Sequence, residues 1–129
     1  MSTQALLRFA LAVFGTVFLL IYPLAIVWPS GWAWHAGAPQ DSQYFMMIVG
    51  VYATLGVFLL IAARNPAAHR SLIWFTVWSS VVHAGIMALQ SMPHEHRGHL
   101  MGDVPALLLV AIVLGVLLGW SEAEQGSEP

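Results

Sequence analysis

Long apolar segments, separated by short polar stretches, account for most of this chain. Each segment approaches the ~20 residues that a helix needs to cross the hydrocarbon core of a membrane. The pattern therefore predicts an all-α integral membrane protein, built as an up-down four-helix transmembrane bundle with short loops. The expected spans cover about residues 8–28, 44–63, 68–91 and 103–120, which makes residues 1–120 one membrane domain and leaves residues 121–129 as a disordered acidic tail.

A proline interrupts the first of these spans near its end. Pro23 has no N–H, so the carbonyl of Leu19 loses its helical partner, and we expect the helix to bend there. A cleaved signal peptide is the alternative interpretation, with Ala36-Gly37-Ala38 as the small-residue cleavage site. The apolar part of a signal peptide is about 7–15 residues long, shorter than this segment, which favours a membrane span.

Turn and capping residues separate the spans. The stretch 28–42 is rich in Pro, Gly and Trp, which predicts a loop with an interfacial belt of tryptophans. Asn65 followed by Pro66 is typical of a helix start, with Asn as the N-cap and Pro in the first helical position. Asp103 followed by Pro105 predicts the cap of the last helix in the same way.

Composition agrees with a membrane domain and excludes several functional classes. Hydrophobic residues make up 59% of the 129 residues and charged residues 8%, whereas soluble domains carry about 25% charged residues. The chain contains no lysine and no basic patch of the kind that nucleic-acid binding requires. It also contains no cysteine, which excludes disulfides, thiolate metal ligands and a cysteine nucleophile.

The arginines predict which side of the membrane each loop faces. Four spans put both termini on one side, together with Arg8, Arg64 and Arg70, whereas Arg97 lies on the other side. Cytoplasmic loops carry an excess of positive residues, so we expect both termini in the cytoplasm. The Trp-rich loop and the His-rich turn at residues 92–101 then face outward.

The helix expected around residues 76–90 carries one mildly polar face, which should contact other protein rather than lipid. Its deepest ionisable group is His83, and an ionisable group at that depth is costly. Three interpretations of His83 remain open: a proton relay, an axial ligand of a tetrapyrrole, or a neutral histidine that hydrogen-bonds Tyr22, Tyr52, a serine or a backbone carbonyl. The face consists of Thr76, Ser80, His83, Met87 and Gln90.

The polar turn before the last span contains the pattern His94-x-His96-x-x-His99. Asp103 lies one helical turn beyond the third histidine, and His35 comes from the neighbouring outer loop. Imidazole and carboxylate ligands suit Zn(II), Cu(II) or Ni(II), so these five residues are a candidate metal site. The alternative is a solvated polar turn in which the aspartate only caps the helix.

The last span is apolar on every side and carries small residues at Ala111, Gly115 and Gly119. Small residues at this spacing let helices approach closely inside a membrane. We expect this face to pack against another helix, in this chain, in a second copy or in another membrane subunit.

Four stretches of the chain carry a family resemblance. They are Tyr22-Pro-Leu with Trp28-Pro-Ser-Gly-Trp32, Gly50-Val-Tyr-Ala-Thr-Leu-Gly56, His69-Arg to His83-Ala-Gly85, and Gly98-His99-Leu with Gly102-Asp103-Val-Pro105. Together they resemble a family of small bacterial four-span membrane proteins that is known only as a domain of unknown function. The resemblance implies a four-helix membrane fold and implies no activity. We expect the chain in the bacterial inner (cytoplasmic) membrane. His83, His99 and Asp103 match the family's pattern more closely than His94 and His96.

Three functional classes follow, in order of preference. The first is an accessory or structural subunit of a larger membrane assembly, indicated by the apolar last helix and its small-residue face. The second is a metal- or cofactor-binding membrane module built on His83, His99 and Asp103. The third is a small transporter or redox enzyme in which His83 relays protons, although the chain lacks the repeats between which transporters build substrate sites. An enzyme is disfavoured because no Ser/His/Asp arrangement occurs at catalytic spacing.

Overall fold

A computed structural model describes residues 1–127 of the chain, apart from the side chains of Glu95 and His96. All regular structure within these residues is helical, which confirms the predicted all-α class. The α-helices are α1 (Thr3–Leu19), α2 (Ile21–Val27), α3 (Pro29–Trp32), α4 (Gln43–Ala62), α5 (Arg70–Gln90) and α6 (Asp103–Gly126), and the short 3-10 helices are η1 (Pro39–Asp41), η2 (Pro66–His69) and η3 (His94–Leu100).

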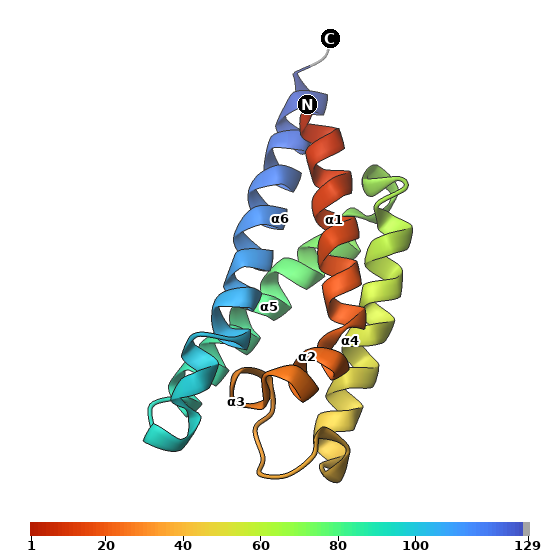
Figure 1. Ribbon diagram of the computed structural model, residues 1–129. Helices are drawn as coiled ribbons and strands as arrows, with labels where there is room; N and C mark the ends of the chain where they lie inside the picture. The colour runs from red at the N-terminus through yellow and green to blue at the C-terminus, as the bar shows by residue number, and fades with distance from the viewer. Residues whose placement is uncertain (128–129) are drawn as a thin grey trace.

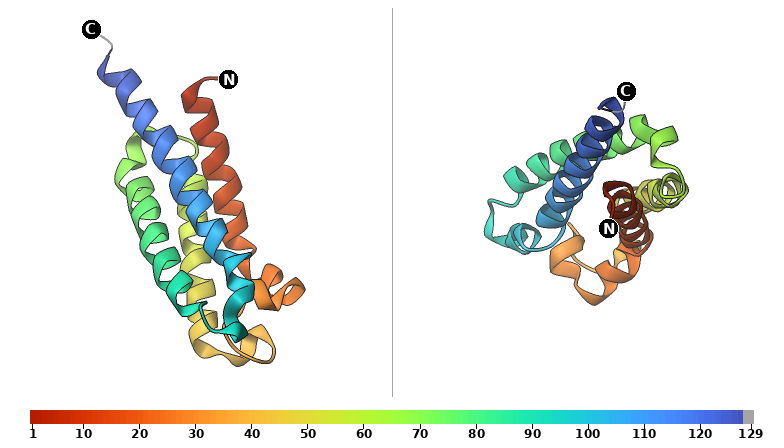
Figure 2. Two further views of the ribbon diagram at one scale, coloured as in Figure 1. Left: turned by 90° about the vertical axis from the view of Figure 1, so that its left-hand side faces the viewer. Right: turned by 90° about the horizontal axis from the view of Figure 1, so that it is seen from above.

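The long helices form two pairs that are joined through α1 and α6. Helix α1 packs along α4, and α5 packs along α6, whereas α4 and α5 touch only sparingly (Figure 2). Both termini lie at one end of the molecule, and α2, α3, η1 and η3 lie at the other (Figure 1). The Trp-rich loop and the His-rich turn therefore meet at the same end, as the sequence predicted, and α3 contacts η3.

Three of the described helices are long and apolar enough to cross a membrane: α4, α5 with η2, and α6 with η3. The bent pair of α1 and α2 makes a fourth span if the two helices cross as one. Large apolar side chains are exposed on the outside of these helices, as expected for contact with lipid. They include Phe9, Phe58, Phe75 and Ile112.

The first span bends where the proline predicts it. Helix α1 ends at Leu19, and α2 begins at Ile21 and runs at 59° to it. Pro23 explains the break because it cannot donate to the carbonyl of Leu19. The bend turns α2 across the end of the molecule and directs the following loop toward η3.

Two glycines allow the close crossing of α1 and α4. A Cβ atom added to Gly15 would lie 2.8 Å from the carbonyl oxygen of Gly56, and one added to Gly56 would lie 2.5 Å from the carbonyl oxygen of Gly15. Any side chain at either position would push the two backbones apart. The same helices contribute Leu7, Leu11 and Leu59, which are fully buried, to the core.

The last helix is longer than the sequence suggested. Helix α6 continues past the expected end at Trp120 to Gly126, so the residues from 121 to 126 are helical and not a disordered tail. Polar residues of this segment contact α1 and α5, although only Ser121 is buried and the residues from 123 to 126 are exposed. Ser121 accepts a hydrogen bond from Gln4 at 2.5 Å, Glu124 accepts one from Thr3 at 2.6 Å, and Glu122 lies 3.9 Å from Nε of Arg70.

Two helix starts differ from the expected capping. Asn65 holds the N-cap position without a side-chain capping hydrogen bond, Pro66 begins η2, and α5 follows only at Arg70. At the start of α6 the N-cap is Gly102, and Asp103 is the first helical residue. Asp103 does not have the predicted N-cap position, and its carboxylate accepts hydrogen bonds from two other side chains.

Candidate functional site

A buried carboxylate lies at the N-terminus of α6. Asp103 is 5% exposed, and its Oδ2 accepts a hydrogen bond from Nε1 of Trp34 at 3.0 Å. The same oxygen lies 2.9 Å from Nδ1 of His99, whose ring is 1% exposed and stacks on the indole of Trp34. The positive end of the α6 dipole further favours a carboxylate at this position. These three residues form the Asp103 cluster.

Glycines bring the segments of the Asp103 cluster together. A Cβ atom added to Gly98 would collide with the backbone of Ser30, and one added to Gly102 would collide with the backbone of Gly31. Helix α3 therefore lies directly against η3 and the start of α6, which is possible because neither glycine has a side chain. This contact positions the loop after α3 so that the side chain of Trp34 lies within hydrogen-bonding distance of Asp103.

Two polar atoms of this region have no hydrogen-bond partner among the described residues. They are Oδ1 of Asp103 and Nε1 of Trp32, and both are shielded from solvent. An unpaired buried polar group costs about 1–3 kcal/mol, and more when it is charged, so such groups are rare. Oδ1 of Asp103 is thus a buried acceptor that no described residue satisfies.

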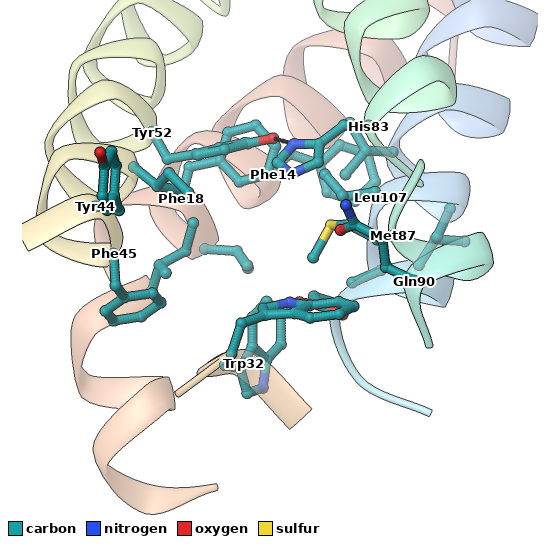
Figure 3. A pocket seen from close by; sticks show the side chains of 18 of the residues that line it. Phe14, Phe18, Trp32, Tyr44, Phe45, Tyr52, His83, Met87, Gln90 and Leu107 are labelled. Carbon is teal, nitrogen blue, oxygen red and sulfur yellow. Dashed lines mark hydrogen bonds between the residues drawn. The ribbon is translucent and has the colours of Figure 1, made fainter. Parts of the chain in front are cut away.

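Both residues line a cavity of about 550 Å³ between α1, the loop around α3, α4, α5 and α6. This volume lies within the range of small-molecule sites. Tyr52 and His83 lie on one side of the cavity and Trp32 on the opposite side (Figure 3). The lining is mostly apolar, and no arginine is among the described residues that form it. Its aromatic members are Phe14, Phe18, Trp32, Trp34, Tyr44, Phe45 and Tyr52.

His83 has a hydrogen-bond partner on another helix. Its Nδ1 is hydrogen-bonded to the hydroxyl of Tyr52, which links α5 to α4, and Tyr52 is one of the partners predicted from the sequence. Phe18 of α1 packs edge-on against the Tyr52 ring, with 5.0 Å between the ring centroids. The polar face of α5 contacts protein over most of its length, since Thr76, Ser80 and Met87 are buried, whereas Gln90 at its end is exposed.

A second hollow, of about 380 Å³, lies between α4 and α5. It shares Tyr44, Ile48, Tyr52 and His83 with the cavity, so these side chains form a wall between the two spaces. This second hollow is a groove that is mostly apolar and lies where α4 and α5 touch only sparingly.

The structure brings together two of the predicted metal ligands. His99 and Asp103 are hydrogen-bonded, whereas Nε2 of His35 lies 2.8 Å from a backbone oxygen of its own loop, and His94 is exposed at the start of η3. The described side chains contain no group of three or more that could hold a metal ion. The side chain of His96 lies outside the described residues, so the metal site stays a prediction.

The small-residue face of α6 packs partly within this chain. Ala111 is buried, and a Cβ atom added to Gly115 would lie 3.4 Å from Val77 of α5. A Cβ atom added to Gly119 would meet nothing within 4 Å. The terminal part of this face is therefore open.

Trp32 and Trp34 are the site residues that the sequence analysis missed. A tryptophan in a loop next to a membrane span gives the same compositional signal whether it lies among lipid headgroups or folds inward. The sequence feature that could have indicated the contact is the presence of Gly31 in the Trp-rich loop and of Gly98 and Gly102 in the His-rich turn. Glycines permit a close approach but do not indicate which segments approach each other.

The whole described chain corresponds to one family. It matches the model of a family of unknown function, DUF6632, over residues 1–128, and it belongs to that family. No curated protein and no solved structure matches the chain. The membership agrees with the resemblance found in the sequence and brings no activity with it.

Proposed function

We propose that this member of DUF6632 binds a small, largely apolar organic molecule in the cavity between its helices. The observation that carries the proposal is the cavity of about 550 Å³, whose lining is mostly apolar and aromatic and includes Asp103, His83 and Gln90. Ligand sites typically combine an apolar lining with a few polar groups that orient the ligand. A binding module is therefore preferred over the accessory subunit that the sequence alone favoured.

In the proposed arrangement the protein is an up-down four-helix transmembrane bundle in the bacterial inner membrane, with both termini in the cytoplasm. The arginines support this orientation, because Arg8, Arg64 and Arg70 belong to the segments near the termini and Arg97 belongs to the opposite end. The Asp103 cluster then lies near the outer surface of the membrane.

The proposed ligand enters from the membrane through the groove between α4 and α5. In support, the groove is mostly apolar and is divided from the cavity by a wall that includes Tyr52 and His83. A hydrogen bond between helices in a membrane is worth only about 0.6–2 kcal/mol, so thermal motion opens such a wall readily.

A neutral fluorescent probe, N-phenyl-1-naphthylamine, tests whether the cavity binds ligands. We expect saturable binding to the protein in phosphatidylcholine nanodiscs, above the signal of empty nanodiscs. Ala106→Phe should remove this binding because the added ring fills space in the cavity lining. Ala123→Phe is the matched control, since Ala123 is exposed at the other end of the same helix. Equal binding by wild type and Ala106→Phe would contradict the proposal.

The natural ligand can be sought in the same pair of variants. Organic extracts of protein purified in mild detergent should contain a small molecule that is present with wild type and with Ala123→Phe, and is depleted with Ala106→Phe. Its mass spectrum identifies it without any assumption about its chemistry.

An accessory role in a larger membrane assembly is the second candidate. In its favour, the open surface at Gly119 is followed by Trp120, which is 60% exposed. Gentle purification from the native membrane tests it. Partner proteins at fixed stoichiometry, lost in Gly119→Leu, would support this role, whereas a chain that purifies alone would count against it.

A further inference from the structure

We infer that the ligand of the cavity is a lipophilic alcohol, whose hydroxyl group hydrogen-bonds the pair formed by Tyr52 and His83. This inference rests on the proposed function and narrows the chemical class of the ligand. It is carried by the place of this pair in the cavity wall, by the hydrogen-bonding capacity that the pair retains and by the apolar side chains beside it.

The Tyr52–His83 pair is accessible from the cavity. Both residues line it, and both also line the groove between α4 and α5. Neither residue is fully buried. Figure 3 shows the hydroxyl of Tyr52 and the ring of His83 meeting at the border of the cavity. A molecule in the cavity can therefore reach the pair.

The pair retains a donor and an acceptor after its internal hydrogen bond has formed, and neither side chain has another hydrogen-bond partner among the described residues. If the hydroxyl of Tyr52 donates to Nδ1 of His83, Nε2 still carries a hydrogen and the phenolic oxygen still accepts. If Nδ1 donates instead, the hydroxyl still donates and Nε2 still accepts. Both tautomers of the ring thus leave one donor and one acceptor, and a protonated ring would leave a further donor.

A hydroxyl group on the ligand matches this capacity. It donates one hydrogen bond and also accepts, so it can satisfy both open positions of the pair. An ether or a carbonyl oxygen only accepts, and a hydrocarbon does neither. A charged group would lose its hydration in a mostly apolar cavity, which is costly. An anion would also lack an opposite charge, because no arginine is among the described lining residues and the chain has no lysine.

The side chains beside the pair suit the apolar part of an alcohol. Phe18 packs edge-on against the ring of Tyr52, with 5.0 Å between the ring centroids. Phe14 and Leu107 line the same cavity and lie close to the pair in Figure 3. Burial of the apolar part of the ligand against these side chains is favourable, and it excludes water that would otherwise compete for the hydroxyl group.

A matched pair of compounds tests this class of ligand. We would measure how 4-phenylbenzyl alcohol and 4-ethylbiphenyl, which have nearly the same shape, displace N-phenyl-1-naphthylamine from the wild-type protein in phosphatidylcholine nanodiscs. Concentrations are expressed per lipid, so that unequal partition into the bilayer does not affect the comparison. The alcohol should bind at least about fivefold more tightly, the contribution expected from two hydrogen bonds between neutral groups. Equal affinity of the two compounds would overturn the inference.

A double variant locates the hydrogen bonds. Tyr52→Phe/His83→Phe should abolish the preference for the alcohol, because rings of similar size replace both polar side chains. Replacement of both partners of a hydrogen bond by apolar groups can be nearly neutral for stability, so we expect this variant to fold. The control, Tyr22→Phe/His69→Phe, makes the same two substitutions at residues that do not line the cavity, and it should keep the preference.

The outcomes separate this inference from the proposed function. An unchanged preference for the alcohol in a folded Tyr52→Phe/His83→Phe protein would also overturn the inference. If this variant does not fold, the comparison of the two compounds on the wild-type protein still decides. Displacement by both compounds alike refutes only the alcohol, whereas absence of N-phenyl-1-naphthylamine binding to the wild-type protein refutes the proposed function itself.

Discussion

At the scale of single residues, the Asp103 carboxylate is held by donors from two other segments of the chain. Trp34 comes from the loop after α3, and His99 comes from η3. Hydrogen bonds to a charged group contribute about 1.5–3 kcal/mol, more than those between neutral groups. Removal of either donor should therefore lower the free energy of unfolding, and single substitutions can test the two donors separately.

Trp34→Phe should lower the free energy of unfolding by about 1–3 kcal/mol, because the ring can still stack on His99 while Asp103 loses a donor. The change is measured by titrating the protein in mixed micelles with sodium dodecyl sulfate and following its circular dichroism. Trp120→Phe serves as the control, since Trp120 is 60% exposed. Equal effects of the two substitutions would mean that the hydrogen bond to Asp103 is not stabilising.

Tyr52→Phe should lower the free energy of unfolding by about 0.6–2 kcal/mol through loss of the hydrogen bond to His83. The same titration measures it, with Tyr44→Phe as the control on the same helix, because Tyr44 is 78% exposed. The double variant with His83→Ala tests the pairing directly. Its effect should be smaller than the sum of the two single effects, and strict additivity would show that the pair contributes nothing.

At the scale of the elements, the α1–α4 pair depends on a backbone contact that admits no side chain. Gly15 and Gly56 face each other across the crossing, and the bend after Leu19 directs α2 away from the axis of α1. The α5–α6 pair is held instead by side chains such as Ile73 and Leu114, both fully buried. A methyl group added at the α1–α4 crossing should therefore destabilise the protein more than one added at a helix position without close neighbours.

Gly56→Ala should destabilise the protein by about 1–3 kcal/mol, because the new methyl group forces the backbones of α1 and α4 apart. Gly50→Ala on the same helix is the matched control, since its Cβ would meet nothing within 4 Å. The control should leave stability unchanged or raise it by up to about 1 kcal/mol, the difference in helix propensity between Ala and Gly. Thermal unfolding of the two variants side by side distinguishes these outcomes.

At the scale of the whole molecule, the two termini are tied together by polar contacts. The side chain of Thr3 in α1 donates a hydrogen bond to Glu124 in α6, and that of Gln4 donates one to Ser121. The start of α1 and the end of α6 therefore lie at the same end of the molecule. The opposite end is closed by α2, α3, η1 and η3, and it holds the Asp103 cluster (Figure 1).

The orientation can be tested because the chain has no cysteine of its own. We expect Ala36→Cys to react with a membrane-impermeant maleimide in intact spheroplasts, and Ser127→Cys to react only after lysis, because positive residues favour the cytoplasmic side. Wild-type protein provides the unlabelled control. The reverse pattern would overturn the proposed orientation.

Local features of the sequence were sufficient to predict the helical class, the approximate helix positions and the bend after Leu19. These features follow from local causes: the length of an apolar segment, its period and a proline without an N–H. It also indicated His83, His99 and Asp103, because polar groups within apolar helices or at their ends stand out.

The contacts that these residues make depend on the folded arrangement of the helices. The pairing of Trp34 with Asp103 depends on how closely α3 approaches η3, and the helical end after Trp120 contacts α1 and α5. The cavity likewise lies between five segments that are far apart in the chain, an arrangement that no local pattern encodes. Such contacts join residues that are far apart in the chain. Their free energy depends on how closely the segments approach each other, and the sequence of one segment does not predict that distance.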